Sequence, residues 1–231
     1  MLFPRRLARF RWLSLPICGA LLTVILGGCG ALAAHPTHVS ATYSTHIQTP
    51  VPTPQASSVV YQASLIGSTP GWSSNPVCDF TSAGLVIKPS GGQAYICLAP
   101  TSPIANGSIS VTVTRLSGAP DHAFGIAFRH NEPKSYYFFG VDGRGRFTLD
   151  VVTNDVSQTI IPFTVSPAVR AGTGAVNTLN VATSGQTVLL TINGTQVAQA
   201  TIAAFTSGAV GLRGINAGSV RFTQLTVTQS A

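Results

Sequence analysis

The chain has 231 residues, of which 45% are hydrophobic and 8% are charged, and its formal net charge is +7. A chain this apolar is not intrinsically disordered, because disorder needs low hydrophobicity and high net charge. Its length allows one sizeable domain with appendages or two small domains. Only one long apolar run occurs, near the N-terminus, which excludes a multi-span membrane protein.

The N-terminus has the pattern of a secretory signal peptide. Four arginines among the first eleven residues precede an apolar stretch, Trp12–Leu26, which is the order of an n-region and an h-region. The stretch runs into Leu-Gly-Gly-Cys, ending at Cys29, and this ending resembles the bacterial lipobox. We expect residues 1–28 to be a lipoprotein signal peptide and Cys29 to carry the lipid. An ordinary cleavage site with an incidental cysteine is the alternative.

Much of the net positive charge of the chain lies in this predicted signal peptide. Removing its four arginines from the 13 basic residues leaves nine, against six acidic residues, so the net charge falls to +3. The nine are scattered and form no basic run or stripe. We therefore expect no nucleic-acid partner.

Residues 29–58 are predicted to be a linker, because they are rich in Thr, Ser and Pro and lack hydrophobic periodicity. His35, His38 and His46 lie in this segment at irregular spacing. We interpret them as solvated linker residues, with a metal-binding tract as the alternative.

Residues 59–231 are predicted to form one β-domain. Short stretches with period-two alternation or strand-forming residues follow one another between turn signals, among them Asp142-Gly143. Such spacing is typical of a two-sheet sandwich. In chain order the predicted strands are Val77–Phe80, Tyr95–Leu98, Ser108–Arg115, Ala123–His130, Tyr136–Val141, Arg146–Val152, Asn177–Thr183, Thr187–Asn193, Thr195–Ala200 and Ser219–Thr228.

Two local irregularities are expected within this series. The apolar phase shifts between Phe222 and Leu225, which predicts a β-bulge at Thr223 or Gln224. One helical turn is expected near Ile202–Phe205.

Cys78 and Cys97 are the only cysteines in the predicted domain. In an exported protein two such thiols commonly pair, so we predict a disulfide that joins the strands Val77–Phe80 and Tyr95–Leu98.

Three segments resemble a known group of domains: FGIAFRHNEPKSYYFFGVDGRGRFTL (Phe124–Leu149), NTLNVATSGQTVLLTINGTQVA (Asn177–Ala198) and GAVGLRG (Gly208–Gly214). Their spacing of Gly, aromatic and apolar residues is similar to concanavalin A-like, laminin-G-like domains, a group that includes 3-keto-disaccharide hydrolase-like domains of secreted bacterial proteins. The resemblance implies an all-β, two-sheet antiparallel jelly roll. It implies no single activity, because this fold hosts lectins, glycosidases and adhesion modules.

Strand alternation divides the residues between Ala123 and Val152 into two faces. The apolar set is expected to form the core: Phe124, Ile126, Phe128, Tyr137, Phe139, Val141, Phe147, Leu149 and Val151. The opposite set is expected on an open sheet face: Arg129, Tyr136, Phe138, Arg146, Thr148 and Asp150.

This open face is the predicted ligand-binding site. Aromatic rings can stack on the C–H side of a sugar, and Arg and Asp can hydrogen-bond its hydroxyls. The candidate binding residues are Arg129, Tyr136, Phe138, Arg146 and Asp150. Ordinary cross-strand pairing on a scaffold or interaction surface is the alternative.

No catalytic constellation is visible in the sequence. Glycoside hydrolysis usually needs two carboxyl groups at a set separation, and the six carboxylates show no such arrangement. They are Asp79, Asp121, Glu132, Asp142, Asp150 and Asp155. We expect no catalytic residue, cofactor or metal site.

Together these patterns predict an exported, non-catalytic binding module that is anchored to the cell membrane by a lipid and folded outside the cytoplasm. Its expected partner is a carbohydrate or another cell-envelope component. Two alternatives stay open: a glycosidase-like enzyme of the 3-keto-disaccharide hydrolase type, and a domain that recognises a protein partner at the cell surface.

Overall fold

The computed structural model describes residues 56–67, 69–72, 75–89, 93–132, 134–215 and 218–230. The predicted signal peptide, the lipidation candidate Cys29 and residues 29–55 of the predicted linker lie outside the described residues. Within the described part of the chain, no helix has the length and apolar character needed to cross a membrane.

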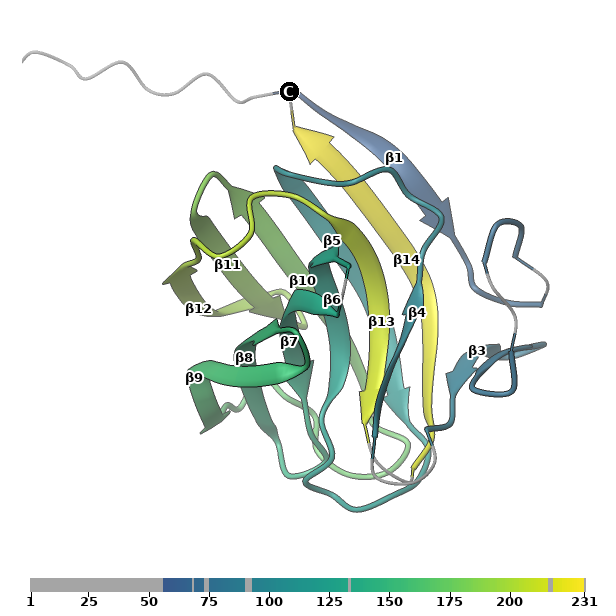
Figure 1. The fold of residues 1–231 in the computed structure, drawn as a ribbon. Coiled ribbons are helices and arrows are strands. Elements are labelled where there is room, and N and C mark those ends of the chain that lie inside the picture. Colours follow the sequence, from purple (N-terminus) through teal and green to yellow (C-terminus); the bar gives the residue numbers. More distant parts are fainter. Residues whose placement is uncertain are drawn as a thin grey trace, which may run out of the picture. The chain divides into compact units, whose positions relative to one another are not determined.

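Two antiparallel sheets form the domain, and Figure 1 shows one in front of the other. The eight-stranded sheet has the spatial order β12 (Thr195–Thr201), β11 (Thr187–Ile192), β10 (Val176–Ser184), β5 (Gly107–Arg115), β14 (Val220–Ser230), β3 (Gly84–Ile87) and β2 (Cys78–Thr81), with β1 (Ser57–Ala63) also paired to β14. The six-stranded sheet has the order β4 (Ala94–Leu98), β13 (Ala209–Ile215), β6 (Phe124–Asn131), β7 (Ser135–Val141), β8 (Arg146–Thr153) and β9 (Val156–Val165). The predicted all-β, two-sheet sandwich is confirmed.

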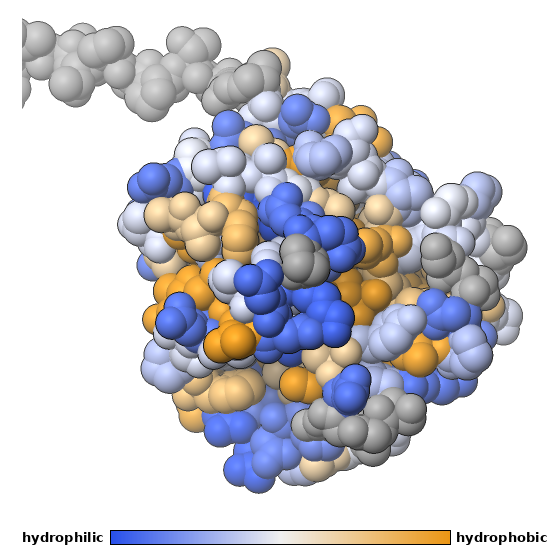
Figure 2. All heavy atoms as spheres, viewed as in Figure 1, coloured by the Kyte–Doolittle hydropathy of each residue, from blue (hydrophilic) through white to orange (hydrophobic). Residues whose placement is uncertain are grey.

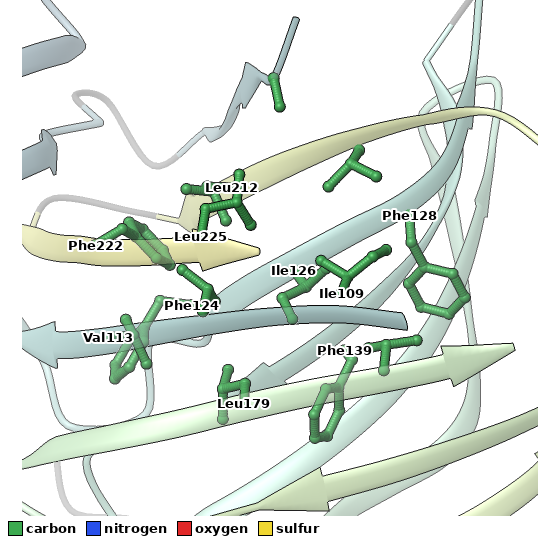
Figure 3. Packing of buried hydrophobic residues seen from close by; sticks show 14 of the residues in the cluster. Ile109, Val113, Phe124, Ile126, Phe128, Phe139, Leu179, Leu212, Phe222 and Leu225 are labelled. Atoms are coloured by element: carbon green, nitrogen blue, oxygen red, sulfur yellow. The ribbon is translucent and has the colours of Figure 1, made fainter. Parts of the chain in front are cut away.

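The core lies between the sheets. Ile126, Phe128 and Phe139 point inward from the six-stranded sheet and meet Leu179 and Phe222 from the eight-stranded sheet (Figure 3). All nine predicted core residues of the β6–β8 meander belong to this cluster or pack against it. Each large apolar side chain that is fully buried stabilises the fold by about 1.5–3 kcal/mol.

The bulge predicted near the C-terminus is confirmed, because the pairing of β14 with β5 shifts between Thr223 and Thr226 and Gln224 has φ 56°. The helical turn predicted at Ile202–Phe205 is wrong. This segment carries the chain from the eight-stranded sheet to the six-stranded sheet in an extended path. Its amides are satisfied by a side chain, since Ala204 and Phe205 donate their backbone N–H groups to Tyr137 Oη at 2.6 and 3.2 Å.

The predicted disulfide between Cys78 and Cys97 is confirmed, with the two Cα atoms 6.0 Å apart. Cys78 lies in β2 of the eight-stranded sheet and Cys97 in β4 of the six-stranded sheet, and both are buried. The bond therefore fastens β4, which is an edge strand, to the opposite sheet.

Candidate functional site

The outer face of the six-stranded sheet is the side that points away from the core. Because Tyr137 and Phe139 point inward, Tyr136 and Phe138 point outward from β7. Asp150 lies opposite Phe138 in the β7–β8 register. On β13, Leu212 packs in the core and the next residue, Arg213, points to the outer face, where it meets the rings of Tyr136 and Phe138.

Two glycines make room for a stacked arrangement on this face. Gly125 of β6 lies opposite Arg213 of β13 on one side and Gly140 of β7 on the other. The two neighbouring glycine positions therefore leave β6 and β7 without side chains in the row that Arg213 begins. A Cβ atom at Gly140 would lie 2.4 Å from Cζ of Phe138, which shows that the Phe138 ring occupies this space. The guanidinium carbon of Arg213 lies 4.1 Å from the centroid of that ring and 5.7 Å from the centroid of Tyr136. Phe138 is fully buried beneath Arg213 and within a cluster that also contains Ala123, Ala127, Tyr136 and Val152.

Arg213 is a buried cation with aromatic neighbours. Its residue surface is 8% exposed, and burial lowers the pKa of its guanidinium, while Tyr136 and Asp150 act in the opposite direction. Its Nε is buried without a hydrogen-bond partner. None of the ion pairs among the described residues includes Arg213. Burial likewise raises the pKa of the Tyr136 hydroxyl and of the Asp150 carboxyl.

His130 extends the aromatic surface of Tyr136. The two rings are stacked, with centroids 5.6 Å apart and planes 18° apart. Burial lowers the pKa of His130 from its ordinary value of 6.5, and the nearby Glu132 carboxylate opposes this shift. Burial of His130 therefore favours the neutral form of the ring.

Two adjoining hollows lie beside Tyr136. The first has a volume of about 300 Å³ and is lined by Gln93, Ala94, Tyr95, Ile96, Leu98, His130, Glu132, Lys134, Tyr136 and Asp155. The second has a volume of about 340 Å³ and is lined by Gln93, Ala94, Lys134, Tyr136, Val152, Asp155, Ser157 and Arg213. Because five residues line both hollows, we treat them as one groove, which runs from β4 past Tyr136 to β8 and β9. In Figure 2, hydrophilic residues gather where Figure 1 places the β6–β7 turn, and apolar residues flank them.

An ion pair crosses this groove. Lys134 Nζ lies 2.6 Å from Asp155 Oδ2, and this pairing raises the pKa of Lys134. Lys134 belongs to the β6–β7 turn and Asp155 to the β8–β9 turn, and the backbone N–H of Asp155 donates to the carbonyl of Lys134. The two turns are therefore tied together at the edge of the groove.

The structure places four of the five predicted binding residues on or beside the outer face, but only Tyr136 lines the groove. Phe138 is covered by Arg213, and Asp150 lies next to Phe138 without lining either hollow. Arg146 lies at the start of β8, where it forms an ion pair with Asp142 at 2.6 Å and stacks over Phe163 at 4.6 Å.

The predicted position of Arg129 on the open face is wrong. Both pairings of β6 shift register here, and Arg129 has φ 48°, so the strand alternation is interrupted. Its guanidinium donates hydrogen bonds to the backbone carbonyls of Phe205, Ala105 and Gly185 at 2.7–2.9 Å. The side chain is 3% exposed and joins three loops.

The sequence reasoning missed most residues that line the groove, including Tyr95, His130, Lys134, Asp155 and Arg213. One signal for Arg213 was available, because strand alternation in Val210–Arg213 places it opposite the core residues. Its neighbours could not be predicted from the sequence, since β13 pairs with β6 and β4 over a separation of about 80 to 120 residues.

The carboxylates of the chain are mostly engaged in ion pairs. Four of the six are paired with a Lys or Arg side chain: Asp79 with Lys88, Asp121 with Arg144, Asp142 with Arg146 and Asp155 with Lys134. Among the described residues, no group of three or more His, Cys, Asp or Glu side chains could hold a metal ion.

No protein-family model and no curated protein matches the chain. Solved structures do match its fold. A carbohydrate-binding module, CBM66 from Bacillus subtilis, superposes with a TM-score of 0.56 at 16% sequence identity, over 76% of this chain and 96% of the module. The fold is a jelly roll.

Two further structures share this jelly roll. A β-glucanase of Bacillus licheniformis has a TM-score of 0.53 at 8% identity and covers 72% of this chain and 96% of its own. A Bacillus subtilis protein of unknown function with a galectin-like fold has a TM-score of 0.54 at 9% identity, over 77% of this chain and 98% of its own. At these identities the likeness shows the fold and does not transfer an activity.

Proposed function

We propose that the domain is a non-catalytic binding module for a carbohydrate, which it holds in the groove beside Tyr136. The observation that carries the proposal is the lining of the groove. Tyr95 is exposed and offers a ring surface, the buried and stacked rings of Tyr136 and His130 form part of the wall, and the Lys134–Asp155 pair offers hydrogen-bonding groups of both signs. Sugars present apolar C–H faces and a rim of hydroxyls, so they need both kinds of contact.

The fold comparison supports the same function. A carbohydrate-binding module and a glucanase are built on this jelly roll, so the architecture can present a face to saccharides. The size of the groove is also suitable, because ligand pockets have volumes of about 300–1,000 Å³.

The carboxylates at the groove favour binding over hydrolysis. Asp155 is paired with Lys134, and Glu132 is exposed in the β6–β7 turn. Asp150 is half-buried beside the outer-face stack, and it lines neither hollow. A glycosidase usually needs an acid and a second carboxylate that flank one bond. Of the two carboxylates that line the groove, Asp155 is held by Lys134, which leaves Glu132 as the one without an ion pair among the lining residues.

We further propose that the domain acts outside the cytoplasm and is anchored by lipid at Cys29. The buried disulfide between Cys78 and Cys97 supports export, because structural disulfides persist in oxidising compartments. Mass spectrometry of the protein purified from membranes tests the anchor. A diacylglyceryl group on Cys29 supports it, and a cleaved, unmodified N-terminus overturns it.

Polysaccharide affinity electrophoresis of the purified protein tests carbohydrate binding. We expect Tyr95→Ala to weaken retardation by about tenfold, since stacking of a ligand ring on an exposed aromatic side chain contributes about 1–3 kcal/mol. Tyr136→Ala should weaken it as well, because it removes a buried part of the groove wall. Phe163→Ala is the matched control, because Phe163 is 42% exposed on β9, the opposite edge strand, while Tyr95 is 38% exposed on β4.

Equal retardation of the wild type and both tyrosine variants would overturn the proposal. So would the absence of retardation across a panel of cell-wall and storage polysaccharides. Release of reducing sugar ends during the same incubation would instead establish the glycosidase alternative.

A further inference from the structure

We infer that the carbohydrate carries an acidic group, and that this group pairs with the Arg213 guanidinium in the second hollow. The inference rests on the proposed function, and it names the chemical class of ligand at the same groove. A uronic acid or another sugar with a carboxylate substituent fits this description.

The first step is the charge of the second hollow. Its charged lining residues are Lys134, Asp155 and Arg213. Lys134 and Asp155 neutralise each other at 2.6 Å. Arg213 remains as a cation without an ion pair among the described residues. The Asp150 carboxyl interacts with it electrostatically, but burial raises the pKa of that carboxyl and Asp150 lies outside the lining, so the residues that line this hollow carry a net positive charge.

The second step is the hydrogen-bonding capacity of Arg213. A guanidinium has five N–H donors, and an aromatic ring satisfies none of them fully. The faces of Arg213 contact Phe138 and Tyr136, and the Tyr136 hydroxyl is an acceptor for it. Nε is buried and has no hydrogen-bond partner, as in Arg115 and Arg129, so the terminal N–H groups are the donors that a ligand would meet. A carboxylate can accept two parallel hydrogen bonds from such a planar fork, which is the strongest common pairing for arginine.

The third step is the contrast with the other cations of the domain. Lys88, Lys134, Arg144 and Arg146 each have a carboxylate partner. Arg129 donates to three backbone carbonyls. Arg115, which is also buried and has no carboxylate partner, donates to the Thr173 hydroxyl and the Gly118 carbonyl. Arg213 is the buried cation at the groove, and a ligand anion would supply the ion-pair partner that it lacks among the described residues.

The carboxylates near the groove set the position of the acidic group. Glu132 lines the first hollow and is absent from the lining of the second, and Asp150 lies near Arg213 but lines neither. An anionic substituent is therefore repelled in the first hollow and attracted in the second. We expect neutral sugar units beside Tyr95 and the acidic unit beside Arg213.

Titration calorimetry with matched polymers tests the inference. The probes are polygalacturonate and alginate, each compared with its carboxyl-reduced form, which keeps the chain length and removes the charge. At fixed ionic strength we expect the wild type to bind at least one acidic polymer about tenfold more tightly than its reduced form. Arg213→Gln should abolish this preference, and Arg213→Lys should keep part of it, because it preserves the charge without the planar fork.

Arg170→Gln is the matched control, since Arg170 is exposed in the β9–β10 connection and lines neither hollow. It should keep the full preference. The inference is overturned if no acidic polymer binds more tightly than its reduced form, or if Arg213→Gln keeps the preference. Equal binding of both forms, lost in Tyr95→Ala, would leave the proposed function standing. If Arg213→Gln does not fold, the polymer comparison on the wild type and Arg213→Lys still gives the answer.

Discussion

Arg129 and Arg213 lie on adjacent strands of one sheet, and both are buried, yet their surroundings are opposite in kind. Arg129 points away from the groove into a junction of three loops, where backbone carbonyls accept hydrogen bonds from its guanidinium. Arg213 lies over the rings of Phe138 and Tyr136 at the groove and has no ion pair among the described residues. The Nε atom is buried without a hydrogen-bond partner in both arginines, so the difference lies in the terminal N–H groups. Burial by itself therefore does not distinguish a structural arginine from a binding one. The supply of hydrogen-bond acceptors does.

The largest effect on stability is expected for Arg129, the structural arginine. Arg129→Met removes the guanidinium that bonds three part-buried carbonyls; Ala105 keeps the Thr183 hydroxyl as a donor, whereas Phe205 and Gly185 lose this partner. Each orphaned polar group costs about 1–3 kcal/mol. We expect the free energy of unfolding to fall by about 3 kcal/mol or more, measured by urea denaturation. A fall below about 1 kcal/mol would show that water replaces the guanidinium and that the junction is not built around it.

The disulfide provides the next effect. It closes a loop with a sequence separation of 19 residues, and such a crosslink stabilises a fold by about 3 kcal/mol. The Cys78→Ala, Cys97→Ala double variant should lose about this amount of unfolding free energy. Because β4 also carries Tyr95 and one wall of the groove, carbohydrate binding should weaken as well. Unchanged binding in the double variant would show that pairing with β13 alone positions β4.

Arg213→Gln should change stability much less than Arg129→Met. The lost cation–π contacts are worth about 0.5–2 kcal/mol, and removing a buried cation recovers part of its desolvation cost. We expect a net loss of about 1 kcal/mol in urea denaturation, with the change in ligand preference described above. A loss as large as that of Arg129→Met would remove the distinction between the two arginines.

The smallest effect is a pH dependence that comes from His130, which follows Arg129 in the chain and stacks on Tyr136. Burial holds its folded-state pKa below the unfolded value of about 6.5. Between these two values the unfolded state binds more protons, so stability is full above about pH 6.5 and declines as the pH falls toward the folded pKa.

Thermal unfolding from pH 7.5 to 5 measures this contribution. His130→Gln should flatten the decline below pH 6.5, because it removes the titrating ring. His122→Gln is the control, since His122 lies outside the groove lining. An identical slope in the wild type and His130→Gln would refute the assignment.

Much of the fold was predictable because apolar and polar residues alternate along individual strands. In Ser108–Arg115 burial alternates along the strand as far as Val113. In Tyr136–Val141 every residue is buried, but Tyr137 and Phe139 pack in the core while Tyr136 and Phe138 pack in a cluster on the outer face, so the two predicted faces are kept. The Asp142-Gly143 turn then leads from β7 into β8. The bulge at Gln224 was visible for the same reason, as a phase shift among apolar residues. The disulfide followed from having only two cysteines in the domain.

The site was less predictable because non-local pairing creates it. The alternation of β6 continues through Arg129 in sequence, but the strand bulges where Gly208 of a distant segment packs against it. A Cβ atom at Gly208 would lie 2.4 Å from the carbonyl carbon of Arg129. The same long-range pairing brings Arg213 over Phe138. No periodicity in β6 or β13 alone carries that information.

The pairing of β1 with β14 has a mechanical consequence. Ser57 lies opposite Ser230, so the described chain enters and leaves the domain at the same end of one ladder (Figure 1). A tension applied between these two ends loads the antiparallel ladder one hydrogen-bonded pair at a time, rather than all pairs together. In the described structure β1 pairs only with β14, whereas β14 is also held by β5 and β3. Under force β1 should therefore detach first, and its residues should add to the extended chain outside the domain, while the six-stranded sheet and its groove stay intact.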